Sequence, residues 1–278
     1  MVQNGSNVAR TITVPANSRY TILTNDVAQV GPDQAFSTKL VADQPIIVER
    51  AMYFNNDGHA AGGVTSPITT WYLSEGYTGS GYETFILLQN SNDTETDVAI
   101  TYMLEDGSQI SRTVTVPANA RYTVVTQDAA QVGLDQAFST VLVADLPIIV
   151  ERAMYWPNSD SAVGGHATTG VRQTASDWYL AEGYTGGGFN TFILIQNPNS
   201  SATDVDVTYM VQGGSNVTRT VTIPANSRFT ILANDIAQVG PDQAFSTKLV
   251  AATQSIIVER AMYFGNGGHV AAGVVLAP

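Results

Sequence analysis

The chain carries the hydrophobic pattern of short β-strands along its whole length. Residues 203–212 alternate, with Val205, Val207 and Tyr209 on one side and polar residues on the other, which predicts a strand with one buried face. The run 192–195 is apolar without alternation, which predicts a central strand covered on both faces. We therefore expect an all-β protein that contains both kinds of strand.

Turn-forming residues divide these strands at short intervals. The segment 224–227, Pro-Ala-Asn-Ser, separates two β-branched runs and predicts a turn between two strands. Asn234 and Asp235 precede an apolar pair and could cap one short helical turn. The pattern gives seven or eight strands for each stretch of about 105 residues, which is typical of a sandwich of two antiparallel sheets.

The same motifs recur along the chain in the same order, which indicates an internal repeat. Three copies are present of a Thr-(Val/Ile)-Pro-Ala-Asn motif, of Ala-Gln-Val-Gly-(Pro/Leu)-Asp-Gln and of Ile-Ile-Val-Glu-Arg-Ala-Met-Tyr. The last of these spans 46–53, 148–155 and 256–263. A fourth motif, Trp-Tyr-Leu-(Ser/Ala)-Glu-Gly-Tyr-Thr-Gly followed by Thr-Phe-Ile-Leu, occurs only at 71–90 and 178–197.

We expect three units on this basis: a partial unit at 1–70 that lacks the Trp-Tyr-Leu module, and complete units at 71–177 and 178–278. Met1 aligns with Met103, which follows Tyr102 inside a predicted strand. The sequence therefore predicts that the chain begins in mid-unit, either as a fragment of a longer array or as a reading frame that starts at an internal Met. Any secretion signal would lie upstream.

Charge and composition narrow the possible partners. Only 13% of the residues are charged, and the formal net charge is −12. Such a surface repels phosphate backbones and anionic lipid heads, so we expect no nucleic acid and no membrane surface as partner. No run of apolar residues is long enough to span a bilayer. The chain has no cysteine, which excludes disulfides and thiolate zinc sites.

The motifs WYLAEG at 178–183, VERAMYF at 258–264 and GGH at 267–269 resemble a tandem repeat found in secreted and wall-associated proteins of actinobacteria and Chloroflexi. The resemblance covers nearly the whole chain. It implies tandem Ig-like β-sandwiches in an extracellular, cell-surface setting and no established activity. In the repeat family an Asp often follows the GGH histidine, whereas Ala60, Ala167 and Val270 stand there in this chain.

Nine of the ten arginines recur at matching places in the repeat, and one glutamate recurs beside them. The adjacent Glu and Arg of the Val-Glu-Arg motif point to opposite faces of a strand, so one of them must point toward apolar neighbours. A charge is tolerated there only when it is paired. We expect a structural ion network in which each buried glutamate contacts an arginine of its own unit. The expected members are Glu49, Glu151 and Glu259 with Arg50, Arg152, Arg260, Arg10, Arg112, Arg219, Arg19, Arg121 and Arg228.

The three histidines, His59, His166 and His269, each follow a glycine. We expect each to donate to a backbone carbonyl and anchor a loop between units, since one histidine and no cysteine per unit are too few for zinc. Oxygen ligands for calcium could come from Asp26, Asp33 and Glu49, but their spacing lacks the alternate-residue pattern of a calcium loop. We expect no cofactor, with calcium as the remaining alternative.

The function predicted is that of an extracellular structural or adhesive repeat protein forming a stalk or filament. The incomplete unit would be completed by a neighbouring chain or by an upstream segment, so the expected partner is another copy. An enzyme is not expected, because each unit offers a lone glutamate where glycoside hydrolysis needs two carboxylates. The alternative is a module that binds cell-wall or other carbohydrate through exposed aromatics. Its candidates are Trp71, Tyr72, Trp178 and Tyr179, although core positions explain these residues more simply.

Overall fold

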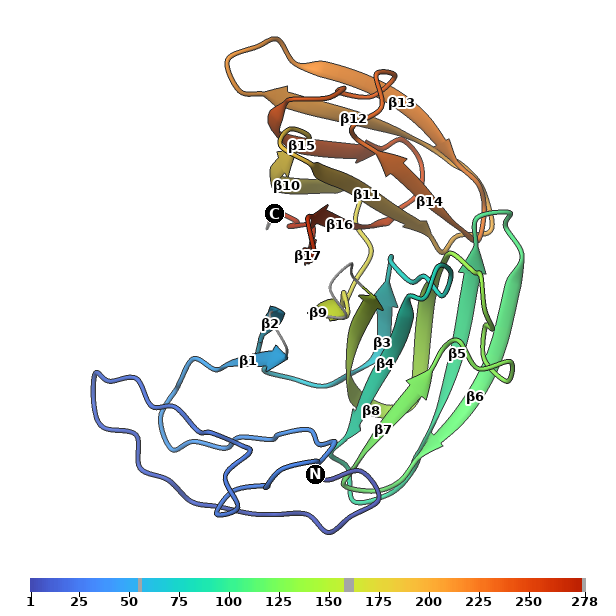
Figure 1. Cartoon of the computed structure of the whole chain (residues 1–278). Helices are drawn as coiled ribbons and strands as arrows, with labels where there is room; N and C mark the ends of the chain where they lie inside the picture. The colour runs from blue at the N-terminus through green and yellow to red at the C-terminus, as the bar shows by residue number, and fades with distance from the viewer. Residues whose placement is uncertain (55–56, 158–162, 277–278) are drawn as a thin grey trace.

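The computed structural model describes residues 1–54, 57–157 and 163–276, and all of its regular elements are β-strands (Figure 1). The seventeen strands pair antiparallel. Within these ranges there is no helix that could cross a membrane. Asn234 and Asp235 lie in a hydrogen-bonded turn, with the Gln238 amide donating to the Asp235 carbonyl at 2.8 Å, so the expected helical turn is absent there.

The middle of the chain folds as two sheets packed face to face. One sheet has the order β3-β8-β5-β6 and the other β7-β4-β8-β9. The long strand β8 runs through both sheets, because its first half pairs with β3 and β5 and its second half with β4 and β9. The strands are β3 (Ile68–Leu73), β4 (Glu83–Asn90), β5 (Thr96–Leu104), β6 (Gln109–Val116), β7 (Ala120–Val125), β8 (Phe138–Pro157) and β9 (Val163–Thr169).

The C-terminal part repeats this arrangement with eight strands, which matches the predicted seven or eight. Its sheets have the orders β10-β15-β12-β13 and β14-β11-β16-β17, so β15 and β16 together take the place of β8. The strands are β10 (Asp177–Tyr184), β11 (Phe189–Asn197), β12 (Thr203–Val211), β13 (Val217–Ile223), β14 (Ser227–Leu232), β15 (Ala244–Ala251), β16 (Ile257–Phe264) and β17 (Gly267–Ala272).

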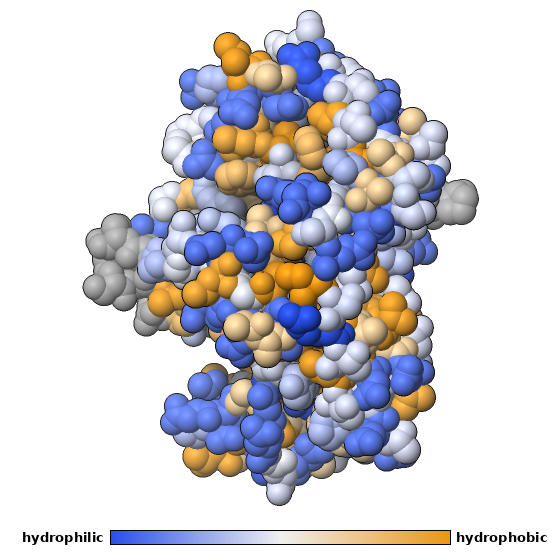
Figure 2. Space-filling view, turned by 90° about the vertical axis from the view of Figure 1, so that its right-hand side faces the viewer, coloured by the Kyte–Doolittle hydropathy of each residue, from blue (hydrophilic) through white to orange (hydrophobic). Residues whose placement is uncertain are grey.

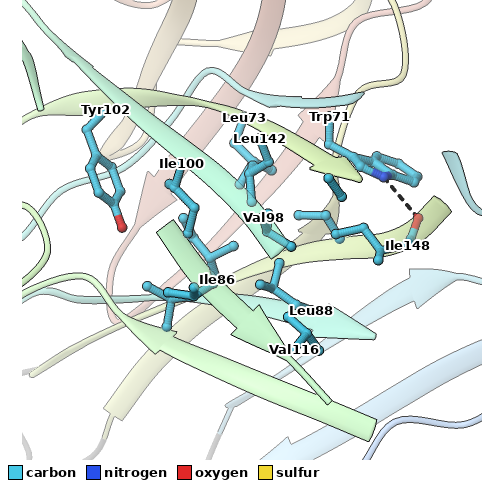
Figure 3. Close-up of a cluster of buried hydrophobic side chains, with 14 of the residues drawn as sticks. Trp71, Leu73, Ile86, Leu88, Val98, Ile100, Tyr102, Val116, Leu142 and Ile148 are labelled. Carbon is cyan, nitrogen blue, oxygen red and sulfur yellow. Dashed lines mark hydrogen bonds between the residues drawn. The ribbon is translucent and has the colours of Figure 1, made fainter. Parts of the chain in front are cut away.

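Each sandwich has its own hydrophobic core. In the first, Trp71 is fully buried, and its indole Nε1 donates to the Ile148 carbonyl at 3.0 Å (Figure 3). Trp178 makes the same bond to the Ile256 carbonyl. Figure 3 shows the Trp71 ring beside the buried side chains of the two sheets. A tryptophan at the start of each complete copy therefore closes one end of the core.

The strand predictions are confirmed in the second sandwich. Val205, Val207 and Tyr209 are buried on one face of β12, with the exposed Asp206 and the partly exposed Thr208 between them. The apolar run 192–195 lies in β11, which has partners on both sides. The turn at 224–227 separates β13 from β14, and Asn226 adopts a positive φ of 50° there, a conformation that asparagine tolerates better than most residues.

The N-terminal part differs from both sandwiches. Residues 1–48 contain no strand, only a bridge between Val2 and Phe36. A hairpin follows, formed by β1 (Glu49–Phe54) and β2 (Asp57–Gly62). The copy that lacks the Trp-Tyr-Leu module therefore has only this hairpin where the complete copies have two sheets.

The three parts of the chain follow an arc (Figure 1). Strand β9 contacts β2 on one side and β17 on the other, and these hairpin strands lie on the inner side of the arc. Hydrophobic and hydrophilic residues are mixed on the face shown in Figure 2. The inner strands therefore bring equivalent residues of successive copies into contact.

Candidate functional site

A cluster of buried charges lies between the two sandwiches, centred on Arg152 in β8. Its guanidinium donates to the Glu75 carboxylate at 2.8 Å and to the Glu75 carbonyl at 3.0 Å. From the second sandwich, Glu259 in β16 accepts from the same guanidinium at 2.7 Å. The Glu259 carboxylate also accepts from the Ser74 amide at 2.8 Å. Two carboxylates from two sandwiches thus share one guanidinium.

Tyr263 and His166 complete the cluster. The Tyr263 hydroxyl donates to Glu75 at 2.9 Å and lies 3.2 Å from His166 Nε2. Because the hydroxyl proton is directed to Glu75, the imidazole must carry its proton on Nε2 to bond the same oxygen. The side chains of Glu75 and Glu259 are 4% and 0% exposed, so solvent does not enter between them.

Burial shifts the pKa values of these groups. It lowers the pKa of Arg152, but Glu259 and Glu75 offset this effect and hold the pKa above its ordinary value. Burial raises the pKa of Glu259, while Arg152 and the Ser74 amide favour its carboxylate form. Burial and then Arg152 hold the pKa of His166 well below 6.5. The 3.6 Å contact between His166 and Glu75 therefore joins a neutral ring to a carboxylate.

Two expectations about the glutamates are corrected by this geometry. Glu259 does not contact an arginine of its own copy, because β16 turns it toward the preceding sandwich, where Arg152 lies. A second carboxylate is also present, since Glu75 lies on the same guanidinium. The pair has no open side for a sugar, because both carboxylates are buried and bridged by Arg152.

The N-terminal hairpin contacts the first sandwich through residues at equivalent positions of the repeat, but fewer residues take part than in the Arg152 cluster. Arg50 donates to Glu151 at 3.0 Å, and His59 Nε2 lies 3.1 Å from the Tyr155 hydroxyl. The Arg50 and Glu151 side chains are 34% and 25% exposed. This pair remains partly solvated because residues 1–70 contain no counterpart of Glu75.

The histidines also differ from expectation. His59 and His166 contact the tyrosine hydroxyl of the following copy through Nε2, a partner that was not predicted for them. His269 lies 3.3 Å from the Arg260 guanidinium and 4.0 Å from the Glu182 carboxylate. Where a following copy is present, the histidine therefore joins two copies.

A second pair of contacts recurs at the edge of the interface. Arg228 lies 3.5 Å from the Glu105 carboxylate of the preceding copy. At the corresponding place, Arg121 donates to the Gln3 side chain. Arg19, the first member of this column, is exposed. Two members of the second arginine column thus make contacts between copies, and Arg121 also donates to Thr123 of its own copy at 2.7 Å.

The first arginine column does not belong to the ion network, contrary to expectation. Arg10, Arg112 and Arg219 donate through Nε to the carbonyls of Ala28, Ala130 and Ala237. In each copy the arginine bonds the turn that follows the Pro-Ala-Asn segment, and its Nε partner is a carbonyl oxygen and not a carboxylate.

The calcium candidates lie apart from one another. Asp26 accepts from the Ala28 amide at 2.8 Å, as a turn cap does. Asp33 adopts a positive φ of 57°, and Glu49 is exposed in β1. No group of three or more His, Cys, Asp or Glu side chains is placed to hold a metal within the described part of the chain.

The aromatic candidates for carbohydrate binding divide into two kinds. Trp71 and Trp178 are buried, so neither ring face is open to a sugar. Tyr72 and Tyr179 are partly exposed, and the Tyr179 ring is covered by Lys248 at 5.6 Å.

Two parts of the cluster were not predicted from the sequence. Glu75 and Glu182 occupy the same place in the two Trp-Tyr-Leu modules, and a tyrosine recurs in every Val-Glu-Arg-Ala-Met-Tyr motif. The signal was the recurrence of a charged residue in an otherwise apolar module, which is the same signal that identified the arginines.

Comparisons with known proteins do not assign a family. No protein-family profile matches the chain, and no curated protein matches it. Among solved structures, the chain resembles Thermotoga maritima 1070 at 13% identity and a TM-score of 0.36, over 38% of this chain and 96% of that one. It resembles the Anabaena sensory rhodopsin transducer at 23% identity and a TM-score of 0.30, over 32% of this chain and 99% of that one. Red sea bream transglutaminase matches at 9% identity and a TM-score of 0.17, over 78% of this chain and 32% of that one.

Proposed function

We propose that this chain is a structural or adhesive protein of the cell surface, built of tandem Ig-like sandwiches that stack into a stalk or filament. The observation that carries the proposal is the position of the cluster of Arg152, Glu75 and Glu259. These three residues belong to recurring charged columns of the repeat, and they lie in the contact between two sandwiches, where they are closed to solvent.

This position favours a mechanical role over a catalytic one. An active site needs its acid or base to meet a substrate, whereas the Glu75 and Glu259 side chains are 4% and 0% exposed beneath the protein groups that they bond. A buried ion pair of this kind fixes the orientation of its two partners more than it adds stability. Copies locked in a single orientation would transmit force along an array.

The test is the location of the protein on intact cells that make it. Immunogold electron microscopy should label the outer surface, and protease added to whole cells should remove the signal. Label confined to the cell interior would overturn the proposal. A purified chain that hydrolyses polysaccharide would overturn the non-catalytic part of it.

A further inference from the structure

The C-terminal sandwich carries a copy of the Arg152 cluster that lacks its second half. Arg260 donates to the Glu182 carbonyl at 2.8 Å and lies 3.2 Å from the Glu182 carboxylate. Arg152 holds Glu75 through the same two contacts. The receiving side of the interface is therefore already formed at this end of the chain.

The two clusters differ in their exposure. The side chain of Glu182 is 61% exposed and that of His269 is 39% exposed. At the buried cluster, Glu75 and His166 are 4% and 2% exposed. Glu259 and Tyr263 cover the buried cluster, and nothing in the described structure takes their place on Arg260.

The missing groups are present at the other end of the same chain. Glu49 and Tyr53 occupy the places of Glu259 and Tyr263 in the recurring motif. Glu49 is exposed, and Tyr53 is 87% exposed. Both lie in β1, which is already paired with β2 in the N-terminal hairpin. The donating strand is thus already formed, and its Glu49 and Tyr53 side chains are exposed.

We propose that the face made by Arg260, Glu182 and His269 binds the strand Glu49–Phe54 of a second copy of this chain. The Glu49 carboxylate would accept from Arg260, and the Tyr53 hydroxyl would contact Glu182 and His269. This inference rests on the proposed function for its biological setting, and on the interface between the two sandwiches for its geometry.

The edge contacts support the same occupant. Glu105 of the first sandwich receives Arg228 of the second. The corresponding residue on the open face is Gln212, which is exposed, and the corresponding arginine on a second copy is Arg19, also exposed. Two independent sets of complementary groups therefore lie at opposite ends of one chain, where a second copy can meet them. Such a contact is heterologous, so it extends into a ring or a filament.

Sedimentation velocity of the whole chain over a range of concentrations tests the proposal. The unmodified chain should associate as concentration rises. Glu49→Arg and Arg260→Glu should each weaken association by about tenfold or more, because each places like charges in the contact. A mixture of the two variants should associate again, since one still offers Glu49 and the other still offers Arg260.

Controls separate docking from folding. Glu95→Arg makes the same charge change at an exposed residue of the first sandwich and should leave association unchanged. His269→Ala removes a half-exposed member of the face. It should weaken association even if circular dichroism shows that Arg260→Glu fails to fold.

A chain that stays monomeric, or variants that associate as the unmodified chain does, would overturn the inference. A monomer displayed on the cell surface would leave the proposed function standing, whereas an associating chain found only inside cells would overturn that function alone.

Discussion

Residues 28–54 and 130–156 differ at only four positions, yet they adopt different structures. The later segment forms β8, a strand of 20 residues that joins two sheets. The earlier segment forms only β1, a strand of six residues at its end. Ile46 is 46% exposed where Ile148 is fully buried. Nearly the same sequence is thus a strand in one place and irregular in the other.

Strand partners explain the difference. In the first sandwich, β8 takes hydrogen bonds from β3, β4, β5 and β9. Strands β3 and β4 belong to the Trp-Tyr-Leu module, which residues 1–70 lack. An isolated hairpin is marginal in water, and ordering each residue costs about 1–2 kcal/mol. Without a partner sheet, burial does not offset this cost.

The largest effect should follow from supplying the missing module. Joining a second copy of residues 71–102 in front of Met1 should turn residues 1–54 into strands and bury Leu40 and Ile46. The free energy of opening for amides in this region should rise from about zero to 5 kcal/mol or more, the range of global unfolding. Hydrogen exchange measures this change.

A matched control carries the same graft with the counterparts of Ile86 and Leu88 changed to aspartate. These two residues are buried in the central strand β4, so the altered graft should leave residues 1–54 unprotected. Equal protection from both grafts would show that chain length, not the strand, orders the segment.

The sequence predicted the strands and turns of both sandwiches, because alternation and turn chemistry are local properties. It did not predict that residues 1–48 would lack strands, because whether a strand forms depends on partners far away in sequence. The same reason explains the error about Glu259. Alternation showed that a charge in the Val-Glu-Arg motif must point inward, but only the packing of two sandwiches places Arg152 beside it.

The next largest effect concerns the glutamate column. Glu259→Ala should lower the free energy of unfolding by about 3–5 kcal/mol, because it leaves Arg152 buried with one carboxylate fewer. Glu151→Ala should cost about 0–1 kcal/mol, since its pair with Arg50 is partly solvated. Glu49→Ala should have no measurable effect at concentrations where the chain is monomeric, because Glu49 is exposed. Urea denaturation of the three variants measures this order, and equal losses would contradict it.

Core substitutions sharpen the comparison between the copies further. Leu142 is fully buried, whereas Leu40, at the same place in the motif, is 43% exposed. Leu142→Ala should cost about 2–5 kcal/mol, and Leu40→Ala less than about 0.5 kcal/mol. Thermal unfolding followed by circular dichroism separates these values. A similar loss for both would mean that residues 1–48 pack in solution as the complete copies do.

The smallest effect is a dependence on pH through the three histidines. Burial lowers the pKa of His59 to about 4, that of His166 well below 6.5, and that of the half-exposed His269 less strongly. The folded chain therefore binds fewer protons than the unfolded chain, in which histidine titrates near pH 6.5. Stability should be full above that pH and should decline as pH falls toward 5. In an NMR titration the half-exposed His269 should become protonated before the fully buried His166. His166→Gln keeps a donor for Tyr263 and should flatten the decline in melting temperature between pH 7 and 5. Common titration of all three rings near pH 6.5 would show that the copies do not bury them differently.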